Sequence, residues 1–481
     1  MNIQKFLALI GIGLLLLPTP SYAAINAATQ WNVRTDGADT NGCAFRAGGS
    51  GTDRSLQASP DDSGTDLVVD AVDNTIVTSA THNFVAADVN NHINISAGAG
   101  YTTGIYEIIS VAANAATLDR SPAAVGTTGG TWALGGACLT MTFVDGLVVA
   151  GNTVNVKGGT YTSATTLGVW TATGTAADPI KIRGYTTTPD DGVGTAAAWT
   201  GPLVTSATNS TALFTINNAD FTTIDGFKFT HTAATRGICV SAVTSSSSPF
   251  RVINSVFDGC SVAINGSTIL TFLTVGNSFI TNSTTNAISI GGAASVITLV
   301  DSIFYNNTGS GITSSHASTT ITALNNVFST NTFGIKNTSA GTSNYLWIKN
   351  NSFVSNTDSG VSLDGTTAER VLLENNIFYG NTTNGISFAT NANGVVMSNK
   401  NNAYGGNGTN RTNIAVGTND VTLTGSPFVS STNWALNSTA GAGAACKSVG
   451  FPGTMLDGVT IGYLDIGAVQ SQSSGGGTRV Y

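Results

Sequence analysis

One phrase of about 25 residues recurs along the second half of the chain, and it limits the fold more than any other feature. From residue 251 onward, an alternating apolar strand leads into Asn or Ser, then an aromatic residue, then Asn, then Gly-Ile or Gly-Val. The aromatic residues follow one another at intervals of 22, 25, 24, 25, 25 and 26 residues, and Asn lies three residues after each of them except the first. The aromatic positions are Phe257, Phe279, Phe304, Phe328, Phe353, Phe378 and Tyr404, and the asparagines are Asn282, Asn307, Asn331, Asn356, Asn381 and Asn407.

This period fits three short strands joined by turns, which is one circuit of a β-solenoid. Successive circuits would stack about 4.8 Å apart, so that like side chains form columns. Asn columns would then bond amide to amide, and stacked aromatic rings would fill the core. A leucine-rich repeat has a similar period but would show fixed leucines and a helical outer segment, and neither is present. The sequence predicts an all-β fold, a single-stranded right-handed parallel β-helix of about 9–11 coils.

Three upstream phrases carry a family resemblance. They are GNTVNVKGGTY (151–161), PIKIRGY (179–185) and FTTIDGFKFTH (221–231), each a short alternating strand that ends in a turn. The first two resemble the opening coils of bacterial parallel β-helix proteins of the pectate-lyase-like superfamily. The segment TIGYLDIGAVQ (460–470) resembles the closing strand of secreted β-helix proteins with variable C-terminal anchors. This resemblance covers roughly residues 145–470 and implies the fold and export, and a polysaccharide as partner.

The first residues have the features of a secretory signal peptide. Lys5 precedes an apolar stretch of twelve residues, Phe6 to Leu17, and a small-residue cleavage site ends at Ala23. Twelve residues span only about 18 Å as a helix, which is too short for a bilayer core of roughly 30 Å. We therefore expect a secreted or cell-surface protein, cleaved near Ala23, whose mature chain has no membrane span. The expected organisation is a signal peptide (1–23), an N-terminal β module or cap (25–140), the β-helix (145–470) and a Gly/Ser-rich tail (471–481).

Charge and cysteine content limit the partners further. Only 9% of residues are charged and the net charge is −8, with no basic cluster, so a nucleic-acid partner is not expected. In an exported protein, pairs of the five cysteines would be oxidised. Cys43 with Cys138 and Cys239 with Cys260 are plausible bridges, which would leave Cys446 over, although the spacing does not settle the pairing. The four histidines, His82, His92, His231 and His316, share no spacing suited to a metal or a catalytic triad and are expected at turns or on the surface.

Two outward-facing columns supply the candidate site residues. On the Gly-Ile strand, the outward column is expected to contain Ala263, Ser289, Thr313, Lys336, Ser362 and Ser387, with Asp364 two positions after Ser362. A second column lies four residues before each aromatic residue and contains Ile253, Val275, Val300, Leu324, Lys349, Glu374 and Lys400. The last three alternate in charge and can pair along the column. Trp347 and Tyr345 are the aromatic residues expected to be exposed on the repeats.

These residues support two kinds of function. A polysaccharide lyase needs a basic residue near the sugar, with carboxylates that hold calcium or an equivalent cation. Lys336, Asp364, Glu369 and Arg370 are the minimal catalytic set for such a reaction. A binding protein needs no such group, and for it the expected substrate-binding residues are Lys336, Ser362, Asp364, Trp347, Lys349 and Glu374.

We predict a protein that binds polysaccharide or a surface without catalysis. A polysaccharide lyase or glycoside hydrolase is the first alternative, with a lyase the more favoured of the two, and a structural rod or phage-like spike module is the second. No metal site or cofactor is evident, and Ca²⁺ is expected only for a lyase. The sequence leaves the glycan and the oligomeric state open.

Overall fold

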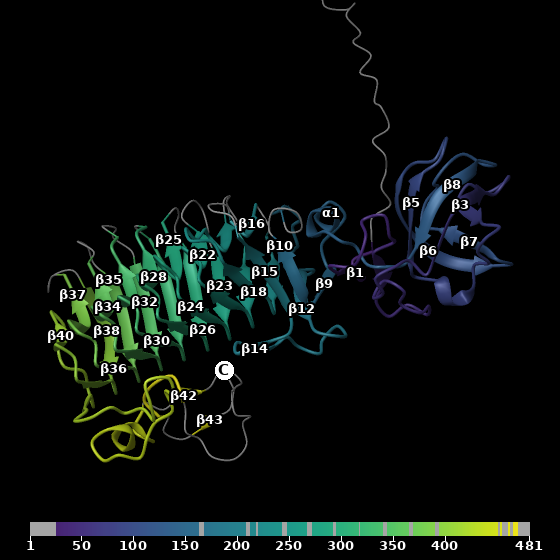
Figure 1. Ribbon diagram of the computed structural model, residues 1–481. Helices are drawn as coiled ribbons and strands as arrows, with labels where there is room; N and C mark the ends of the chain where they lie inside the picture. The colour runs from purple at the N-terminus through teal and green to yellow at the C-terminus, as the bar shows by residue number, and fades with distance from the viewer. Residues whose placement is uncertain are drawn as a thin grey trace, which may run out of the picture.

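The chain folds into a rod of stacked β-coils with a small β-barrel at its N-terminal end (Figure 1). The computed structural model describes residues 26–162, 168–207, 212–217, 220–242, 248–266, 272–291, 295–316, 318–339, 344–364, 369–389, 394–450, 453–454, 460–461 and 465–469. The expected signal peptide and the Gly/Ser-rich tail lie outside these residues. Within the described parts, every helix is too short or too polar to cross a membrane.

Three sheets form the walls of the rod, and each coil contributes one strand to each wall in turn. The strands pair in parallel from coil to coil, apart from one antiparallel strand at the N-terminal edge of the first sheet. The expected parallel β-helix is confirmed, with about nine turns. Sheet 1 consists, in spatial order, of β2 (Ala44–Arg46), β1 (Thr29–Val33), β9 (Thr153–Lys157), β12 (Ile180–Tyr185), β17 (Thr222–Asp225), β20 (Phe250–Ile253), β23 (Phe272–Gly276), β26 (Val296–Val300), β29 (Thr320–Leu324), β32 (Asn344–Lys349), β35 (Glu369–Glu374) and β38 (Gly394–Lys400).

The other two walls follow the same order along the chain. Sheet 2 consists of β10 (Gly159–Thr162), β15 (Pro202–Ser206), β18 (Lys228–His231), β21 (Val256–Asp258), β24 (Phe279–Thr281), β27 (Ile303–Tyr305), β30 (Val327–Ser329), β33 (Ser352–Val354), β36 (Ile377–Tyr379), β39 (Ala403–Gly405) and β41 (Val421–Thr422). Sheet 3 consists of β11 (Val169–Trp170), β16 (Phe214–Ile216), β19 (Val240–Ala242), β22 (Ile264–Gly266), β25 (Ile288–Ile290), β28 (Ser310–Ser314), β31 (Phe333–Asn337), β34 (Ser359–Leu363), β37 (Asn384–Phe388) and β40 (Thr409–Thr412).

Stacked aromatic rings run through the core of the later coils. Phe304, Phe328, Phe353, Phe378 and Tyr404 lie above one another, with ring centroids 4.7 to 5.0 Å apart. All five are almost completely buried. These distances equal the spacing of adjacent strands, so each ring stacks on the ring of the next coil.

The expected stack is wrong at one position. Ile280, not Phe279, pairs with Phe304 and with Phe257 and is fully buried, while Phe279 pairs with the outward-facing Val256. Counting from the corner of the coil, Ile280 is the inward residue of β24, because side chains alternate between the two faces of a strand. The shortest interval of the repeat, 22 residues, arises from aligning this coil on the wrong aromatic residue.

Glycines beside this stack allow the coils to approach. A Cβ atom on Gly360 would lie 2.6 Å from the carbonyl oxygen of Gly385 and 2.9 Å from Cβ of Phe353, and Gly311, Gly334 and Gly385 are equally crowded. A side chain at these positions would push the coils apart. The Gly of the repeated Gly-Ile phrase is therefore required by packing.

Two buried ladders of Asn and Ser follow the corners on either side of sheet 2. Asn356 donates from its backbone N and its Nδ2 to Oδ1 of Asn381, at 3.1 and 2.8 Å, and its own Oδ1 accepts the same two bonds from Asn331. Each side chain thus satisfies polar groups of two coils inside an apolar core. The ladders contain Ser283, Asn307, Asn331, Asn356, Asn381 and Asn407 after sheet 2, and Ser255, Ser278, Ser302, Asn326, Asn351, Asn376 and Asn402 before it.

Left-handed residues turn the chain at the same corners. Asn325, Asn350 and Asn375 have φ values of 58°, 55° and 56°, and Asn tolerates this region better than most residues. Asn282 belongs to this class, with φ 57°, and its side chain bonds to Asp258 and Asn306 on the outside of the coil. Its expected place in the inner ladder is wrong, because Ser283 occupies it.

The N-terminal barrel is closed and has its own core. It consists of β3 (Asp62–Val69), β4 (Ile76–Thr78), β7 (Ala115–Leu118), β6 (Gly104–Ala112), β5 (His92–Ala97) and β8 (Thr128–Leu134), around Trp132, Phe84 and Ile93. The segment expected as one module, residues 25–140, also supplies β1, which pairs in parallel with β9 and so begins sheet 1. Disulfides join Cys43 to Cys138 and Cys239 to Cys260, the two pairs that the sequence suggests, and Cys446 is free and buried.

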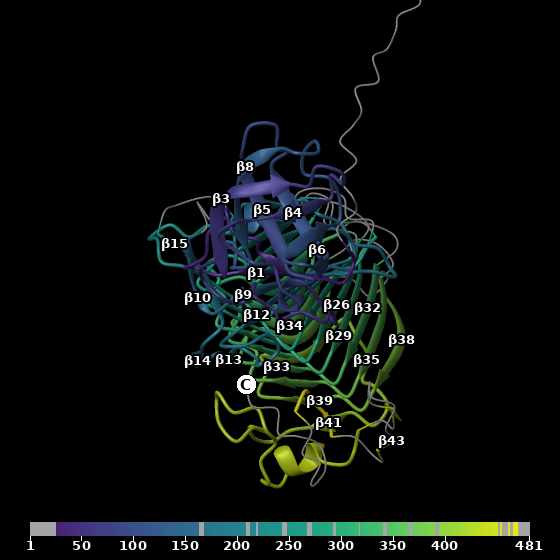
Figure 2. The same ribbon diagram turned by 90° about the vertical axis from the view of Figure 1, so that its right-hand side faces the viewer.

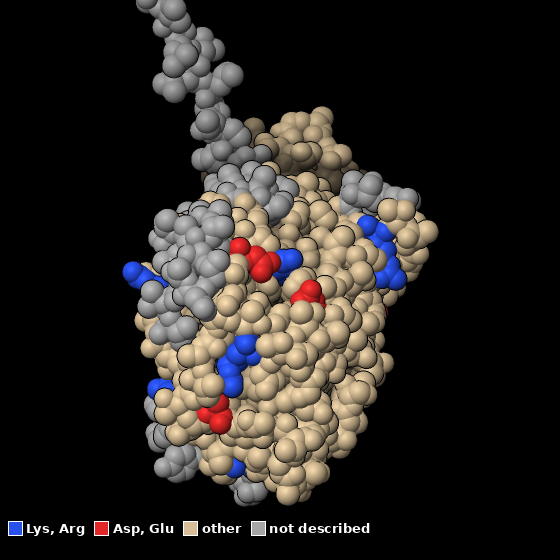
Figure 3. Space-filling view, turned by 90° about the vertical axis from the view of Figure 1, so that its left-hand side faces the viewer, with Lys and Arg blue, Asp and Glu red and all other residues tan. Residues whose placement is uncertain are grey.

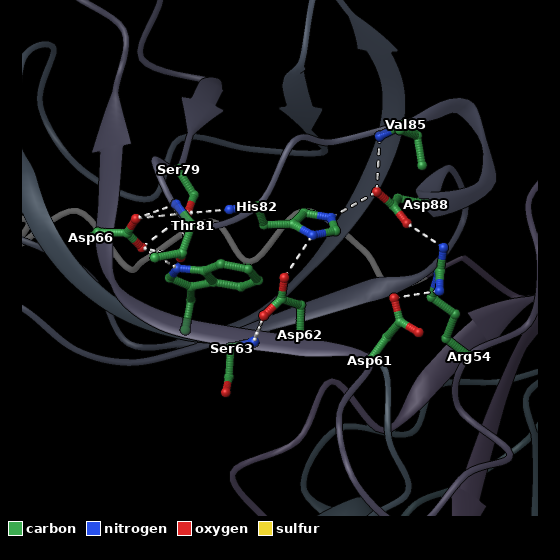
Figure 4. Close-up of polar contacts among 11 residues, drawn as sticks. Arg54, Asp61, Asp62, Ser63, Asp66, Ser79, Thr81, His82, Val85 and Asp88 are labelled. Carbon is green, nitrogen blue, oxygen red and sulfur yellow. Dashed lines mark hydrogen bonds and ion pairs between the residues drawn. The ribbon is translucent and has the colours of Figure 1, made fainter.

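An ion cluster connects the barrel to the segment that precedes it (Figure 4). His82 lies between two carboxylates, with Nδ1 2.9 Å from Asp62 and Nε2 3.0 Å from Asp88. Arg54 contacts Asp88 at 3.0 Å and also pairs with Asp61. Asp88, in the 3₁₀ turn η2 (Ala86–Asp88), is fully buried, so its carboxylate depends on the Arg54 guanidinium and on its contacts with His82 and the backbone N of Val85.

The last coil closes the core with an ion pair. Arg411 occupies the place of the inward Ile386 of the preceding coil, and its guanidinium lies 4.4 Å from the ring centroid of Tyr404, the last ring of the stack. Asp420 contacts Arg411 at 3.1 Å and accepts a bond from the backbone N of Asn402, the last Asn of its ladder. The inward column of Ile386 on sheet 3 therefore ends on Arg411, and the Asn ladder that contains Asn402 ends on Asp420.

The chain then folds back along the outside of sheet 2 (Figures 1 and 2). Phe428, Leu436 and Ile466 pack on Ile377 and Ala403 in a separate apolar cluster. In the expected closing motif, the backbone N of Gly467 donates to the carbonyl oxygen of Asn375 at 2.8 Å, and that of Ala468 donates to Ser352. Gly467 and Ala468 of the motif thus lie against sheet 2 and the corner before it. The remaining elements are α1 (Met141–Asp145), η3 (Gly443–Cys446), and the antiparallel pairs β13 (Gly194–Thr195) with β14 (Ala198–Trp199) and β42 (Gly453–Thr454) with β43 (Thr460–Ile461).

The inner ladder predicts the effect of Asn356→Ala. Two buried donors of Asn331 lose their acceptor, at about 1–3 kcal/mol each, so we expect the free energy of unfolding to fall by roughly 2–6 kcal/mol in urea denaturation. The control Thr298→Ala, on the outer face of sheet 1, should change it by less than about 0.5 kcal/mol. Equal losses for the two variants would contradict a structural role of the ladder.

The ion cluster predicts the effect of Arg54→Met. This change removes the guanidinium from the buried Asp88, which keeps only its contacts with His82 and the backbone N of Val85. We expect about 3 kcal/mol of destabilisation of the barrel, measured by thermal unfolding. The control is Asp190→Asn, which breaks the exposed ion pair with Arg183 and should cost less than about 1 kcal/mol. A barrel as stable as wild type after Arg54→Met would exclude a structural role for the cluster.

Candidate functional site

The outer face of sheet 3 carries the first group of expected site residues. Its outward column contains Asn265, Ser289, Thr313, Lys336, Ser362 and Ser387. Ala263, expected in this column, is fully buried, and Asn265 takes its place. Ala263 lies directly before the inward Ile264, in the position of the repeated glycine, whereas the outward residue of this strand follows that Ile.

A shallow groove of about 430 Å³ lies over β28 and β31 on this face. Its polar lining consists of hydroxyls, the Asn286 amide and the Lys336 ammonium, and Phe333 supplies the aromatic surface. Lys336 Nζ lies 4.1 Å from the centroid of the Phe333 ring, a cation–π contact. The residues that line the groove are Asn286, Thr308, Gly309, Ser310, Thr313, Thr332, Phe333, Lys336 and Thr338.

Asp364 and Ser362 lie at the border of this groove. Lys336 Nζ is 3.7 Å from Asp364 Oδ2, and Ser362 donates a hydrogen bond of 2.6 Å to Asp364 Oδ1. The Asp364 side chain is 44% exposed and that of Lys336 28% exposed, so both remain accessible to a ligand. The structure therefore brings three of the expected substrate-binding residues together.

Arg370 lies on a different wall of the rod from Lys336 and Asp364. It begins the outward face of β35 in sheet 1, where its guanidinium donates to the hydroxyl of Tyr345 and lies 5.1 Å from that ring centroid. Glu369 is also in β35, and its side chain lies outside the described part of the chain. Among the described contacts, none joins Arg370 to Lys336 or Asp364. The expected catalytic set is thus divided between two sheets.

Sheet 1 also carries the second expected column. Lys349 and Lys400 contact Glu374 from the coils on either side, at 3.6 and 3.2 Å, and Ser398 donates a third contact of 2.9 Å. Val275, expected in this column, points into the core and is fully buried, and Gly276 takes its place between Ile253 and Val300. This is the same one-residue shift that affects Phe279.

Exposed aromatic surface accompanies this ladder. Trp347 faces outward from β32 with 49% of its surface exposed, next to Leu372 on the following coil. Figure 3, which views the molecule from the left-hand side of Figure 1, shows few and scattered charged groups. Trp347, Lys349 and Glu374 therefore form a second surface, separate from Lys336, Ser362 and Asp364.

The described histidines do not all lie where we expected them. His92 in β5 and His231 in β18 are buried, and burial lowers the pKa of both, that of His92 to about 4. Because desolvation disfavours the imidazolium, both rings are neutral at pH 7. Among the described residues, no group of three or more His, Cys, Asp and Glu side chains is placed to hold a metal ion.

Phe333 is the residue of the groove that the sequence interpretation missed. In register with it, the neighbouring coils have Ser310, Ser359 and Asn384. When the repeats are aligned, Phe333 is an aromatic residue in a column of otherwise small polar residues, and this signal could have identified it.

The comparisons with known proteins concern architecture. No protein-family model and no curated protein matches the chain. A pectate lyase, Pel9A, is similar over 70% of this chain and 92% of its own, with 13% identity and a TM-score of 0.46. An alginate lyase from Paenibacillus sp. str. FPU-7 covers 59% of this chain and 96% of its own, with 12% identity and a TM-score of 0.39.

A third similar structure is the alginate lyase AlyGC of the PL6 family. It has 14% identity over 61% of this chain and 41% of its own, with a TM-score of 0.39. At this level of similarity no residue role transfers from one protein to another. The chain is a parallel β-helix, and the solved structures that resemble it include pectate and alginate lyases.

Proposed function

We propose that this protein acts outside the cell as a carbohydrate-binding β-helix, which holds a glycan in the groove on sheet 3. The groove with Lys336 and Phe333 at its centre, bordered by Asp364, is the observation that supports the proposal. Catalysis is not required for this role.

The side chains of the groove match the surface of a sugar. The C–H face of a pyranose ring is apolar and packs on an aromatic ring such as Phe333, while its hydroxyls both donate and accept hydrogen bonds. The Thr313 hydroxyl can do both, and Lys336 donates only. The hydroxyls of Thr332 and Thr338 already donate to the carbonyl oxygens of Thr308 and Ser314, so they can accept from a sugar. Asp364 accepts, and Ser362 and Lys336 hold its carboxylate in place.

Rigid strands support this arrangement. Lys336 lies in the middle of β31, paired on one side with Thr313 and on the other with Ser362. Groups fixed by a sheet lose little conformational freedom when a ligand binds, which favours affinity. Since the groove is shallow, it suits a stretch of an extended chain better than a fully enclosed monosaccharide.

The test is binding of the full chain to soluble polysaccharides. We expect retardation in gels that contain at least one of pectin, alginate, hyaluronan, chondroitin sulfate and hydroxyethylcellulose. Lys336→Ala should raise the dissociation constant for the polysaccharide that retards the protein at least tenfold, or about 1.4 kcal/mol. Lys228→Ala, which removes a lysine from sheet 2, is the matched control and should bind as wild type.

Two results would contradict the proposal. Unchanged mobility of the wild type in all five gels would exclude carbohydrate binding of this kind. Release of unsaturated sugar ends, detected by their ultraviolet absorbance, would show the alternative, a polysaccharide lyase. In that case Lys336→Ala should abolish the absorbance increase.

A further inference from the structure

We infer that the outer face of sheet 1 over β32, β35 and β38 is a second carbohydrate-binding surface, so that one molecule holds two glycan chains at once. This inference rests on the proposed function of sheet 3 and adds a second contact to it. From the sequence, Trp347, Lys349 and Glu374 were expected in one site with Lys336. In the structure they lie on sheet 1 and Lys336 lies on sheet 3, and the inference starts from this separation.

Apolar surface is concentrated on this part of sheet 1. Trp347 and Met397 are 49% and 55% exposed and lie on β32 and β38, with Leu372 on the coil between them. Among the strongly exposed large apolar side chains of the described residues, Trp347 is the one aromatic. A group of exposed apolar side chains on a soluble protein marks an interaction surface.

Polar groups flank this apolar strip on both sides. On one side Arg370 stacks on Tyr345 and bonds to its hydroxyl, which fixes both side chains. On the other side Glu374 lies between Lys349 and Lys400. An apolar centre with fixed donors and acceptors along its edges is the arrangement that a pyranose ring requires, since its faces are apolar and its rim carries hydroxyls.

The direction of the bound chain follows from the coil spacing. The stacked rings of the core show that adjacent coils are 4.7 to 5.0 Å apart. This is close to the length of one sugar residue in an extended polysaccharide. A chain that runs along the rod therefore places successive sugars over Trp347 and Leu372, which are in register, and then over Ser398, which pairs with Leu372 and follows the β-bulge residue Met397.

Both surfaces lie on the same few coils but on different walls. Lys336 in β31 and Trp347 in β32 belong to consecutive strands, and both walls enclose the same core. An extended chain that follows one wall along the rod cannot also follow the other. Two occupied surfaces therefore mean two chains, and the protein bridges them.

The experiment is a two-chain capture assay. Each of the five polysaccharides named above is immobilised on beads, protein is added, and a fluorescently labelled soluble chain of the same polysaccharide follows. We expect the wild type to capture labelled chain. Trp347→Ala should still bind the beads through sheet 3 but capture at least tenfold less label, and Trp347→Phe, which keeps an aromatic ring, should retain most of the capture.

The controls separate the two proposals. Lys336→Ala should also lose capture while it keeps only the weaker binding through sheet 1, whereas Val72→Ala, at an exposed position of the barrel, should behave as wild type. If Trp347→Ala captures label as well as wild type does, the second surface is excluded, although sheet 3 can still bind. If Trp347→Ala alone loses all binding to the beads, sheet 1 is the binding surface and the proposal for sheet 3 fails. Circular dichroism of each variant confirms that it is folded.

Discussion

Backbone hydrogen bonds between successive coils fix the distance on which the rest of the molecule depends. Strands pair in register with their counterparts on the coils above and below. Equivalent side chains therefore repeat at the distance between adjacent strands. Rings then stack, and amides such as Asn356 bond to the next coil inside the core. On the outer wall of sheet 1 the same spacing aligns Lys349, Glu374 and Lys400. The coil spacing that stacks the core therefore also positions the side chains of the surface that we propose for binding.

Much of this could be predicted from the sequence, because a repeat constrains both the fold and the columns. Three of the errors share a physical origin. Phe279, Asn282 and Val275 all lie in the coil with the shortest interval, where an aromatic residue beside the inward position was mistaken for the stacking one. Alternation along a short strand makes a one-residue shift reverse the inner and outer faces. Ile280, at the correct distance from the corner, shows the true register.

The candidate site was harder to predict than the fold, since neighbours in sequence occupy different walls. Asp364 ends a strand of sheet 3 and Arg370 begins one of sheet 1, with a corner of the rod between them. Periodicity gives the column of each residue but not which columns meet at a groove. The contribution of Phe333 depends on the lysine beside it, and that contact appears only in three dimensions.

The charged end of the last coil has a consequence for assembly. A solenoid whose final coil resembled the others would present a ready template, and copies could join end to end into fibrils. Arg411 at a core position, neutralised by Asp420, offers an incoming coil a guanidinium where it needs an aliphatic side chain. The barrel covers the opposite end (Figure 1). Growth of a filament is thereby disfavoured at both termini, which allows a repetitive, weakly charged β-rod to stay a discrete particle.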